Sequence, residues 1–332
     1  FMLDWLSEGQ LAAVAGAFGG VLLGLAARIG GFCTLGAIED HLHGGSNVRL
    51  RMWGLAISLS ILLVAGLTAF GLFTPAGSIY LSTGWNPFAV IVGGLMFGIG
   101  MALTGHCCHG ALARLGGGDL RAFVVVLVIG ISAYMTIAGP IAILRVWLFP
   151  VAEAPSASMA DLIGVPFVWA AALVGLAGTA WMLSSRDFLR HGKTLAWAAI
   201  IAFAIASGWA ATDWIAANGF GAEQVRSHSY AAPTGEMLLY VMTMSGSYID
   251  FGIGSVLGVI GGAFLGSTIR REFRWEACED PRELRRQLFG AFLMGTGAVT
   301  AFGCSVGQGL SAFSVLAPSA PLLLISIYVG AA

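Results

Sequence analysis

The chain has 332 residues, of which 58% are hydrophobic and only 10% are charged, and its mean hydropathy is +0.86. A water-soluble domain carries about 25% charged residues, so this composition excludes a soluble globular protein and indicates an integral membrane protein. The net charge of −1 gives no reason to expect nucleic acid as a partner. The 48 glycines favour close helix contacts and broken helices, and therefore a transporter or channel over a simple membrane anchor.

Apolar runs long enough to cross a lipid bilayer as helices recur along the chain. The first, residues 11–31, ends in Arg28-Ile-Gly-Gly-Phe-Cys33-Thr-Leu-Gly36. Paired glycines followed by Cys-Thr predict a helix that stops inside the protein and restarts as a short half-helix. We expect an all-α polytopic membrane protein with about nine transmembrane helices, at residues 11–31, 52–73, 88–104, 121–146, 166–183, 195–211, 251–269 and 288–302 and from residue 321 onward.

Shorter features lie between the predicted spans. We expect short re-entrant half-helices at residues 111–115 and 306–313. A polar connection at 212–236 leads to a further re-entrant piece at 240–248. The Gly-Pro pair at residues 139–140 predicts a kink within the fourth span.

Basic residues predict the orientation, because short cytoplasmic loops are enriched in Lys and Arg. The loops at residues 186–193 and 270–286 are rich in basic residues, whereas those at 74–87, 150–155 and 212–236 have few. Nine spans then place the N-terminus outside and the C-terminus in the cytoplasm, in the inner (cytoplasmic) membrane of the cell.

Two glycine-flanked cysteine segments indicate an internal repeat. The first is Gly105-His-Cys107-Cys-His-Gly110, and the second is Gly303-Cys304-Ser-Val-Gly307. One constant offset aligns four pairs of residues, namely Gly98 with Gly295, Gly100 with Gly297, Cys107 with Cys304 and Gly110 with Gly307.

The predicted topology makes this repeat an inverted one. The span before Cys107 runs inward and the span before Cys304 runs outward, and inverted repeats with broken helices near the midplane are a common transporter construction. We therefore expect a single transmembrane transport domain, residues 1–332, with a first repeat half at 11–148 and a second at 165–332.

Three cysteines at predicted helix breaks are the main candidate site residues: Cys33, Cys107 and Cys304. A broken helix points its free backbone N–H groups and the positive end of its dipole at the break, which favours an anion there. Cysteine adds a soft sulfur that is a weak donor when protonated. The plain alternative, that each cysteine is only a small buried hydrophobe, is less economical for three at glycine-flanked breaks.

Other residues near the breaks are secondary candidates. Cys108 falls where the second repeat has Ser305, so it packs behind the site or lines it. His106 and His109 flank the cysteines and could bind metal, but adjacent ligands on one turn rarely converge on one ion, and no metal site is expected.

Two polar side chains and one further cysteine complete the candidates. Gln308 lies in the second half-helix, where it lines a pore or packs between helices. Arg28 lies near Cys33 at the inner end of the first span, where an arginine is functional or extends to the interface. Cys278 lies in a charged loop and has no predicted role.

These residues carry a family resemblance. Gly-Phe-Cys33-Thr, Gly-His-Cys107 and Phe-Gly-Cys304-Ser-Val-Gly-Gln-Gly-Leu resemble segments of the YeeE/YedE sulfur-transport family. The resemblance implies nine spans, an inverted pseudo-repeat, short helices entering from both faces, and thiosulfate passed along three cysteines, which correspond to Cys33, Cys107 and Cys304. It also implies a small cytoplasmic sulfur-carrier partner of the TusA type. Cys108 and the flanking histidines depart from the pattern of the thiosulfate-uptake members.

The resulting hypothesis is a transporter for thiosulfate or a related sulfur anion, which passes along protonated thiols without covalent chemistry. No cofactor is expected, and the protein is not expected to be an enzyme. The residues leave open a membrane thiol oxidoreductase that uses Cys107-Cys108 or a Cys33 pair, although no Cys-x-x-Cys motif is present. They also leave open a Cys/His metal transporter and a structural scaffold.

Overall fold

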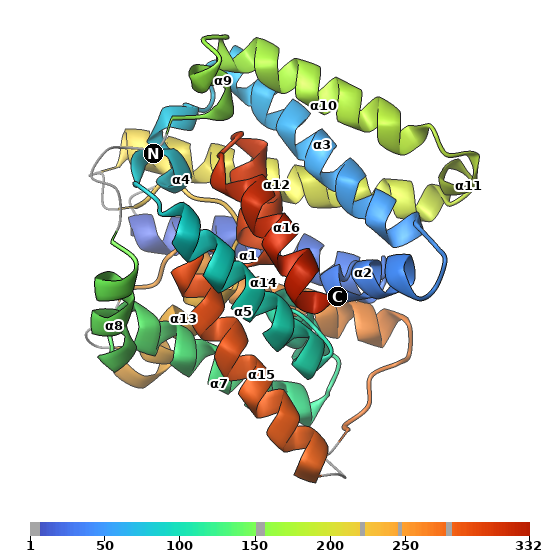
Figure 1. Cartoon of the computed structure of the whole chain (residues 1–332), viewed down its shortest axis with the longest axis vertical. Coiled ribbons are helices and arrows are strands. Elements are labelled where there is room, and N and C mark those ends of the chain that lie inside the picture. The colour runs from blue at the N-terminus through green and yellow to red at the C-terminus, as the bar shows by residue number, and fades with distance from the viewer. Residues whose placement is uncertain (1–6, 151–156, 220–222, 245–247, 277–280) are drawn as a thin grey trace.

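The computed structural model describes residues 7–150, 157–219, 223–244, 248–276 and 281–332, and these residues form helices joined by loops, without a β-strand (Figure 1). The all-α fold is thus confirmed. Six helical segments of the described chain are long and apolar enough to cross a membrane. They are α1 (Glu8–Arg28), α3 (Val48–Ala69), α5 with the short helix after it (Pro87–Gly116), α7 (Leu120–Ile137), α12 (Gly192–Asn218) and α14 (Phe251–Ile269).

The remaining helices are shorter or begin with charged residues. Two are apolar, α10 (Phe167–Leu183) and α16 (Ser319–Ala331), and α15 (Pro281–Thr300) begins in a charged segment. The number of nine spans therefore stays a prediction. The other elements are η1 (Pro75–Gly77), α4 (Ile79–Ser82), α8 (Pro140–Leu148), α9 (Met159–Leu162) and α11 (Arg186–Leu189).

Four short helices each begin directly after a non-helical turn or segment. They are α2 (Thr34–Leu42), α6 (Cys108–Gly116), α13 (Ala231–Thr243) and the π-helical η3 (Gly307–Ala312), which lies within a helical segment of residues 305–314. The predicted half-helices are thus present after Cys33, Cys107 and Cys304, with α6 longer than the expected 111–115 because it begins directly after Cys107.

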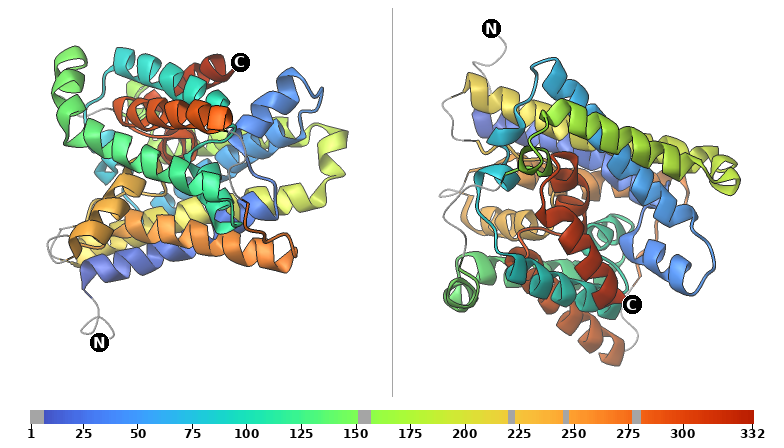
Figure 2. Two further views of the ribbon diagram at one scale, coloured as in Figure 1. Left: turned by 90° about the horizontal axis from the view of Figure 1, so that it is seen from below. Right: turned by 45° about the horizontal axis from the view of Figure 1, so that its top comes forward.

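The long helices pack in groups around these short ones. Figure 1 shows α5 beside α15 and α16, with α3 and α10 on the other side of the molecule, and Figure 2 shows the same groups from two further directions. The C-terminal end of α16 reaches α2, where the rings of His41 and Tyr328 have centroids 6.3 Å apart. The first helices of the chain therefore contact the last.

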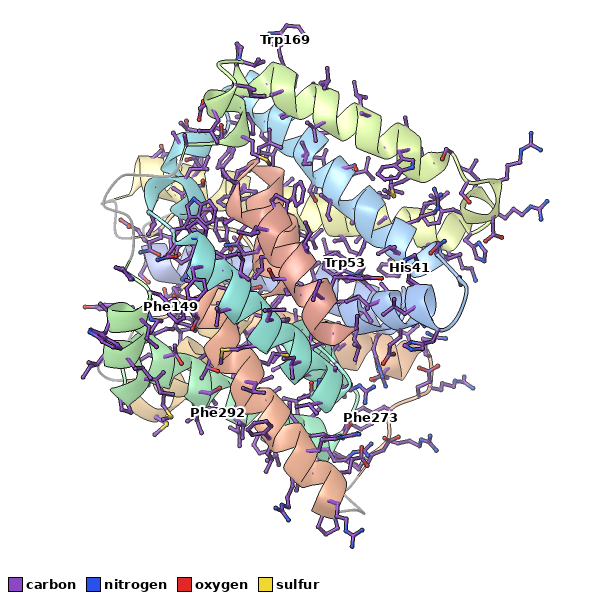
Figure 3. All side chains as sticks on the ribbon, viewed as in Figure 1. His41, Trp53, Phe149, Trp169, Phe273 and Phe292 are labelled. Carbon is purple, nitrogen blue, oxygen red and sulfur yellow. The ribbon has the colours of Figure 1, made fainter. Side chains whose placement is uncertain are left out.

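Many large apolar side chains lie on the outside of this bundle, as expected for a surface that faces lipid. Trp169 on α10 is 72% exposed and points outward (Figure 3). Trp53, in contrast, is buried, and its ring stacks on Phe32 with centroids 4.5 Å apart. The apolar exterior agrees with a multi-pass membrane protein.

Two predicted features differ from the structure. The expected kink in the fourth span is a complete break, because Gly139 is extended and Pro140, which has no N–H to continue the ladder, begins the separate helix α8. The polar connection 212–236 is also shorter than predicted. Helix α12 continues to Asn218, and the Thr212 hydroxyl, which was expected in a loop, bonds to the carbonyl of Gly208 within the helix.

The third re-entrant piece lies earlier than predicted. It was expected at residues 240–248, whereas α13 occupies Ala231–Thr243, and residues 245–247 lie outside the described chain. The buried start of α13 explains the error, because its small and polar residues resemble a loop in sequence.

Helices α1 and α14 are in backbone contact through small residues. Membrane helices associate by such close packing because lipid provides no hydrophobic driving force between them. A Cβ atom on Gly258 would lie 2.4 Å from the carbonyl oxygen of Ala17, and one on Gly20 would lie 2.3 Å from that of Ser255. The opposite side of α14 is open, since a Cβ on Gly261 would meet no atom within 4 Å.

This difference predicts opposite effects of one substitution at two sites on the same helix. Gly258→Ala should lower the free energy of unfolding by about 1–3 kcal/mol, because it forces α1 and α14 apart. Gly261→Ala should raise it by up to about 1 kcal/mol through helix propensity. Chemical unfolding in detergent micelles measures both values, and equal effects would contradict the packing described.

Candidate functional site at the starts of the short helices

Three of the short helices begin in the same way. Each follows a cysteine whose Sγ atom accepts a hydrogen bond from the backbone N–H three residues later, at 3.4 Å in every case. The three donor residues are all glycine, so the pairs are Cys33 with Gly36, Cys107 with Gly110 and Cys304 with Gly307. The side chain of a cysteine thus occupies the N-cap position that usually holds Ser, Thr, Asp or Asn.

The turns before these helices depend on glycine. Gly31 and Gly105 have φ values of 68° and 79°, in the left-handed region that glycine adopts without steric cost. The chain can therefore end one helix and start the next within a few residues. This places each sulfur at the positive end of a helix dipole.

The segments that carry the three cysteines meet at the hydroxyl of Thr34. This hydroxyl lies 3.7 Å from Cys107 Sγ and donates to Ser305 Oγ at 3.1 Å. Thr34 directly follows Cys33, and Ser305 directly follows Cys304. We call Cys33, Cys107 and Cys304 the thiol row. Cys33 is half-buried, whereas Cys107 and Cys304 are each only 1% exposed.

Sequence reasoning missed two hydroxyls beside the thiol row. One is Thr34, and the other is Ser229, whose Oγ lies 3.8 Å from Cys304 Sγ. Neither contact could be found without the fold, because Thr34 is remote in sequence from Cys107 and Ser229 is remote from Cys304. The recurring pattern Cys-x-x-Gly was the available signal for the helix starts.

The fourth short helix, α13, lacks this arrangement. Tyr230 stands at its N-cap without a side-chain hydrogen bond to the helix, and position N3 is Pro233, which has no N–H to donate. The Tyr230 hydroxyl instead accepts from Ser255 Oγ at 3.3 Å, and its ring lies 5.1 Å from that of His109. The start of α13 therefore packs against neighbouring side chains, whereas the starts of the other three short helices each carry a cysteine sulfur.

Around the thiol row the electrostatics favour an anion. The helix starts supply partial positive charge at each sulfur. Near Cys33 a full positive charge is added, since a Cβ on Gly36 would lie 2.6 Å from Nη1 of Arg49. Arg49 also pairs with Asp40, at 3.3 Å.

Buried side chains surround the thiol row without forming a metal centre. Cys108, His106 and His109 are 1%, 4% and 2% exposed. His106 Nδ1 and His109 Nε2 have no hydrogen-bond partner. Within the described residues, no group of three or more His, Cys, Asp or Glu side chains could hold a metal ion. The four described cysteines are free thiols, and Cys278 lies outside the described residues.

Gln308 and Arg28 have structural contacts in this arrangement. Gln308 Nε2 donates to the carbonyl of Phe302 at 3.1 Å, and its Oε1 accepts from Ser319 at 3.0 Å. The Arg28 guanidinium, expected near Cys33, packs against Gly117 at the end of α6, since a Cβ there would lie 2.6 Å from its Nη2. The position of the Arg28 side chain is therefore set by the contact between α1 and the end of α6, which are distant in the sequence.

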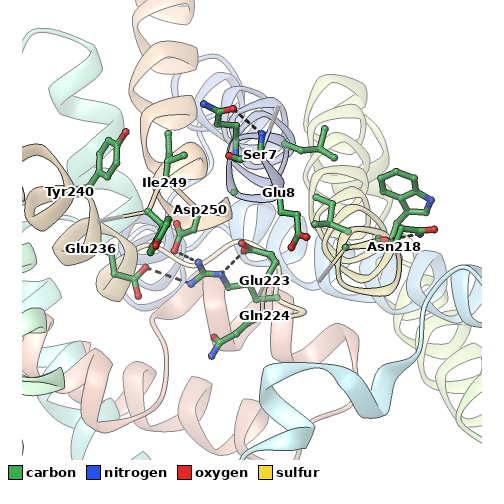
Figure 4. Close-up of a pocket in the computed structure, with 17 residues that line it drawn as sticks. Ser7, Glu8, Asn218, Glu223, Gln224, Glu236, Tyr240, Ile249 and Asp250 are labelled. Atoms are coloured by element: carbon green, nitrogen blue, oxygen red, sulfur yellow. Dashed lines mark hydrogen bonds and ion pairs between the residues drawn. The ribbon is translucent and has the colours of Figure 1, made fainter. Parts of the chain in front are cut away.

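A separate cavity of about 1010 Å³ lies at the start of α1 and the end of α12, and none of the cysteines lines it (Figure 4). Arg226 crosses it and forms ion pairs with Asp250, with Glu236 at 3.6 Å and with Glu223 at 3.8 Å. Carboxylates outnumber the single arginine, so this cavity does not suit a dianion. The ion pairs of Arg226 join the segment before α13 to α13 itself and to the start of α14.

Broken helices whose positive ends meet buried thiols, inside an apolar helical bundle, define the chain as a membrane transport protein. A profile of the family described as "Sulphur transport" matches residues 29–332. The chain belongs to this family, as the resemblance to YeeE/YedE proteins indicated, and it is a transporter and not an enzyme.

Two characterised relatives are similar over almost the whole chain. The thiosulfate transporter TsuA of Spirochaeta thermophila is 25% identical over 329 residues, which cover 94% of each chain. The thiosulfate transporter TsuA of Escherichia coli K12 is 26% identical over 315 residues, which cover 90% of this chain and 86% of the relative.

The burial of the thiols predicts their order of reactivity. In variants that keep one cysteine each, N-ethylmaleimide should label Cys33 about tenfold faster than Cys107 or Cys304, because thiol modification requires access. Mass spectrometry of protein in detergent measures the rates, with labelling in denaturant as the control. Equally rapid labelling of all three would contradict the buried helix starts.

The ion-pair cluster predicts a pH-dependent loss of stability. Arg226→Met should lower the free energy of unfolding by about 3 kcal/mol at pH 8, because it leaves buried carboxylates without their cation. Burial already raises the pKa of Glu223. A raised pKa in the folded state means that protonation favours the fold, so the loss should shrink as the pH falls to 5.

Thermal unfolding of the Arg226→Met variant in detergent at several pH values tests this prediction. Arg274→Met is the control, since the Arg274 side chain is 81% exposed and its pair with Glu276 spans 3.9 Å. A loss that is equal at pH 8 and pH 5 would contradict the assignment.

Proposed function

We propose that the chain carries thiosulfate or a closely related sulfur anion across the cytoplasmic membrane along the thiol row. The observation that carries this proposal is the repeated helix start, in which a glycine N–H lies 3.4 Å from each sulfur. The positive helix ends offset the charge of the anion, and the thiols meet its soft terminal sulfur. The names of both relatives support thiosulfate as the substrate.

The anion passes along thiols that stay protonated. Thiosulfate is a dianion, and a thiolate would repel it. Cys107 and Cys304 lie in the buried core, where an isolated charge would be costly. An S–H group is a weak donor, so each contact is easily broken, as a transport site that must release its substrate requires. No covalent step is involved.

The path follows from an inverted repeat with halves at residues 11–148 and 165–332. The first residues of α2 and α13, Thr34 and Ala231, are separated by the same number of residues as Cys107 and Cys304. This equal separation supports the pairing of α2 with α13 and of α6 with η3. In this arrangement the N-terminus of the chain faces outward and the C-terminus faces the cytoplasm. The anion then moves from Cys304 through Cys107 to Cys33, where a TusA-like carrier protein receives it.

Uptake by cysteine variants tests the proposal. Cys33→Ala, Cys107→Ala and Cys304→Ala should each lower the initial rate of labelled thiosulfate uptake into proteoliposomes by about tenfold or more, because each loses a contact to a charged substrate. Cys108→Ala is the matched control, since this thiol is buried but caps no helix, and it should retain most of the rate.

Two results would count against the proposal. Full uptake by all three variants would remove the thiols from the path, and absence of uptake by the unmodified protein would reject thiosulfate. Competition with sulfate, sulfite and selenite then defines the substrate class.

A further inference from the structure

The thiol row has a second kind of donor beside it that the proposed path does not use. Thr34 Oγ1 lies 3.7 Å from Cys107 Sγ, and Ser229 Oγ lies 3.8 Å from Cys304 Sγ. Each buried thiol is therefore paired with one hydroxyl at nearly the same separation. Thr34 is the first residue of α2, and Ser229 lies in the segment that leads into α13.

The hydroxyls of Thr34, which is buried, and Ser229, which is half-buried, differ from other hydroxyls inside the protein. Ser227 donates to the carbonyl of Ile205 at 2.8 Å, and Thr136 donates to that of Ser132 at 2.7 Å, so both are occupied by the backbone. The hydroxyls of Thr34 and Ser229 instead face sulfur or other hydroxyls. Their partners are side chains and not backbone carbonyls, so each hydroxyl can rotate toward a ligand without breaking a helix hydrogen bond.

Neighbouring contacts hold Ser229 in place. Ser227 is fixed by Ile205, and the carbonyl of His228 accepts from Ser311 Oγ at 2.7 Å. The Tyr80 hydroxyl is a further partner of Ser229. A Cβ on Gly307 would lie 2.6 Å from Ser229 Oγ and 3.1 Å from the Tyr80 hydroxyl, so these groups lie directly over the start of η3.

Thr34 occupies the matching place between the two buried thiols. Its hydroxyl contacts Cys107 Sγ and also donates to Ser305 Oγ at 3.1 Å, next to Cys304 in the chain. One rotatable hydroxyl can therefore serve an anion at either thiol. It lies beside Cys107 and beside Ser305, the residue after Cys304.

We propose that Thr34 and Ser229 are specificity residues that bind the oxygen end of the anion while the adjacent thiol contacts its sulfur end. This inference rests on the proposed function. Thiosulfate carries hard oxygens and one soft sulfur, and O–H groups bind charged oxygens more strongly than S–H groups do. Sulfate offers no soft atom and hydrosulfide no oxygen, so each would use only half of a thiol and hydroxyl pair.

Thiosulfate uptake into proteoliposomes that contain the full chain tests the inference. Thr34→Val and Ser229→Ala should each raise the KM for thiosulfate about tenfold, the effect of one lost hydrogen bond to a charged group. Inhibition by hydrosulfide should change less than twofold, because that ion does not use the hydroxyl. Thr34→Ser, which keeps the hydroxyl, should restore the KM.

Matched controls separate this role from folding. Thr136→Val and Ser60→Ala remove buried hydroxyls that bond only to backbone, and they should leave the KM unchanged. If Thr34→Val fails to fold in gel filtration, Ser229→Ala decides the matter. An unchanged KM in Thr34→Val and Ser229→Ala, with normal uptake by the unmodified protein, would overturn this inference alone. Unmodified protein without thiosulfate uptake would overturn the proposed function as well.

Discussion

The structure depends on one contact, the hydrogen bond from a backbone N–H near a helix start to a cysteine sulfur. A helix start has N–H groups without partners inside the helix, and the bilayer core supplies no water to bind them. Sulfur is a weaker acceptor than the oxygen of Ser or Asp. A cysteine cap at 3.4 Å therefore satisfies the helix only in part. The remaining positive potential favours an anion at these helix starts.

The long helices serve to hold these short ones in position. Helix α1 leads into the turn before Cys33, and its backbone contact with α14 through Gly20 and Gly258 fixes where that turn lies. In the same way α5 leads to Cys107 and α15 leads to Cys304, and a Cβ on Gly100 of α5 would lie 2.5 Å from the carbonyl of Gly290 on α15. Small residues thus determine the spacing of the sulfurs.

Much of this arrangement was predictable from the sequence. Apolar composition indicated a helical membrane protein, and glycine one or two residues before Cys33, Cys107 and Cys304 indicated the breaks. The start of α13 was not predictable from local pattern, because burial by neighbouring helices stabilises a segment that resembles a loop. The positions of Thr34, Ser229 and Arg28 depend on contacts between distant segments, which periodicity does not report.

The fourth short helix differs from the three that follow the cysteines. A thiol and an N–H at the start of α13 would have surrounded an anion with four equivalent sites. Tyr230 and Pro233 remove both groups, and the Tyr230 hydroxyl is bonded to Ser255. A dianion held by four positive helix starts at once would leave slowly, whereas conduction requires binding that is weak and divided among several sites. Under the proposed function, a helix start without a thiol therefore favours passage of the anion over its retention.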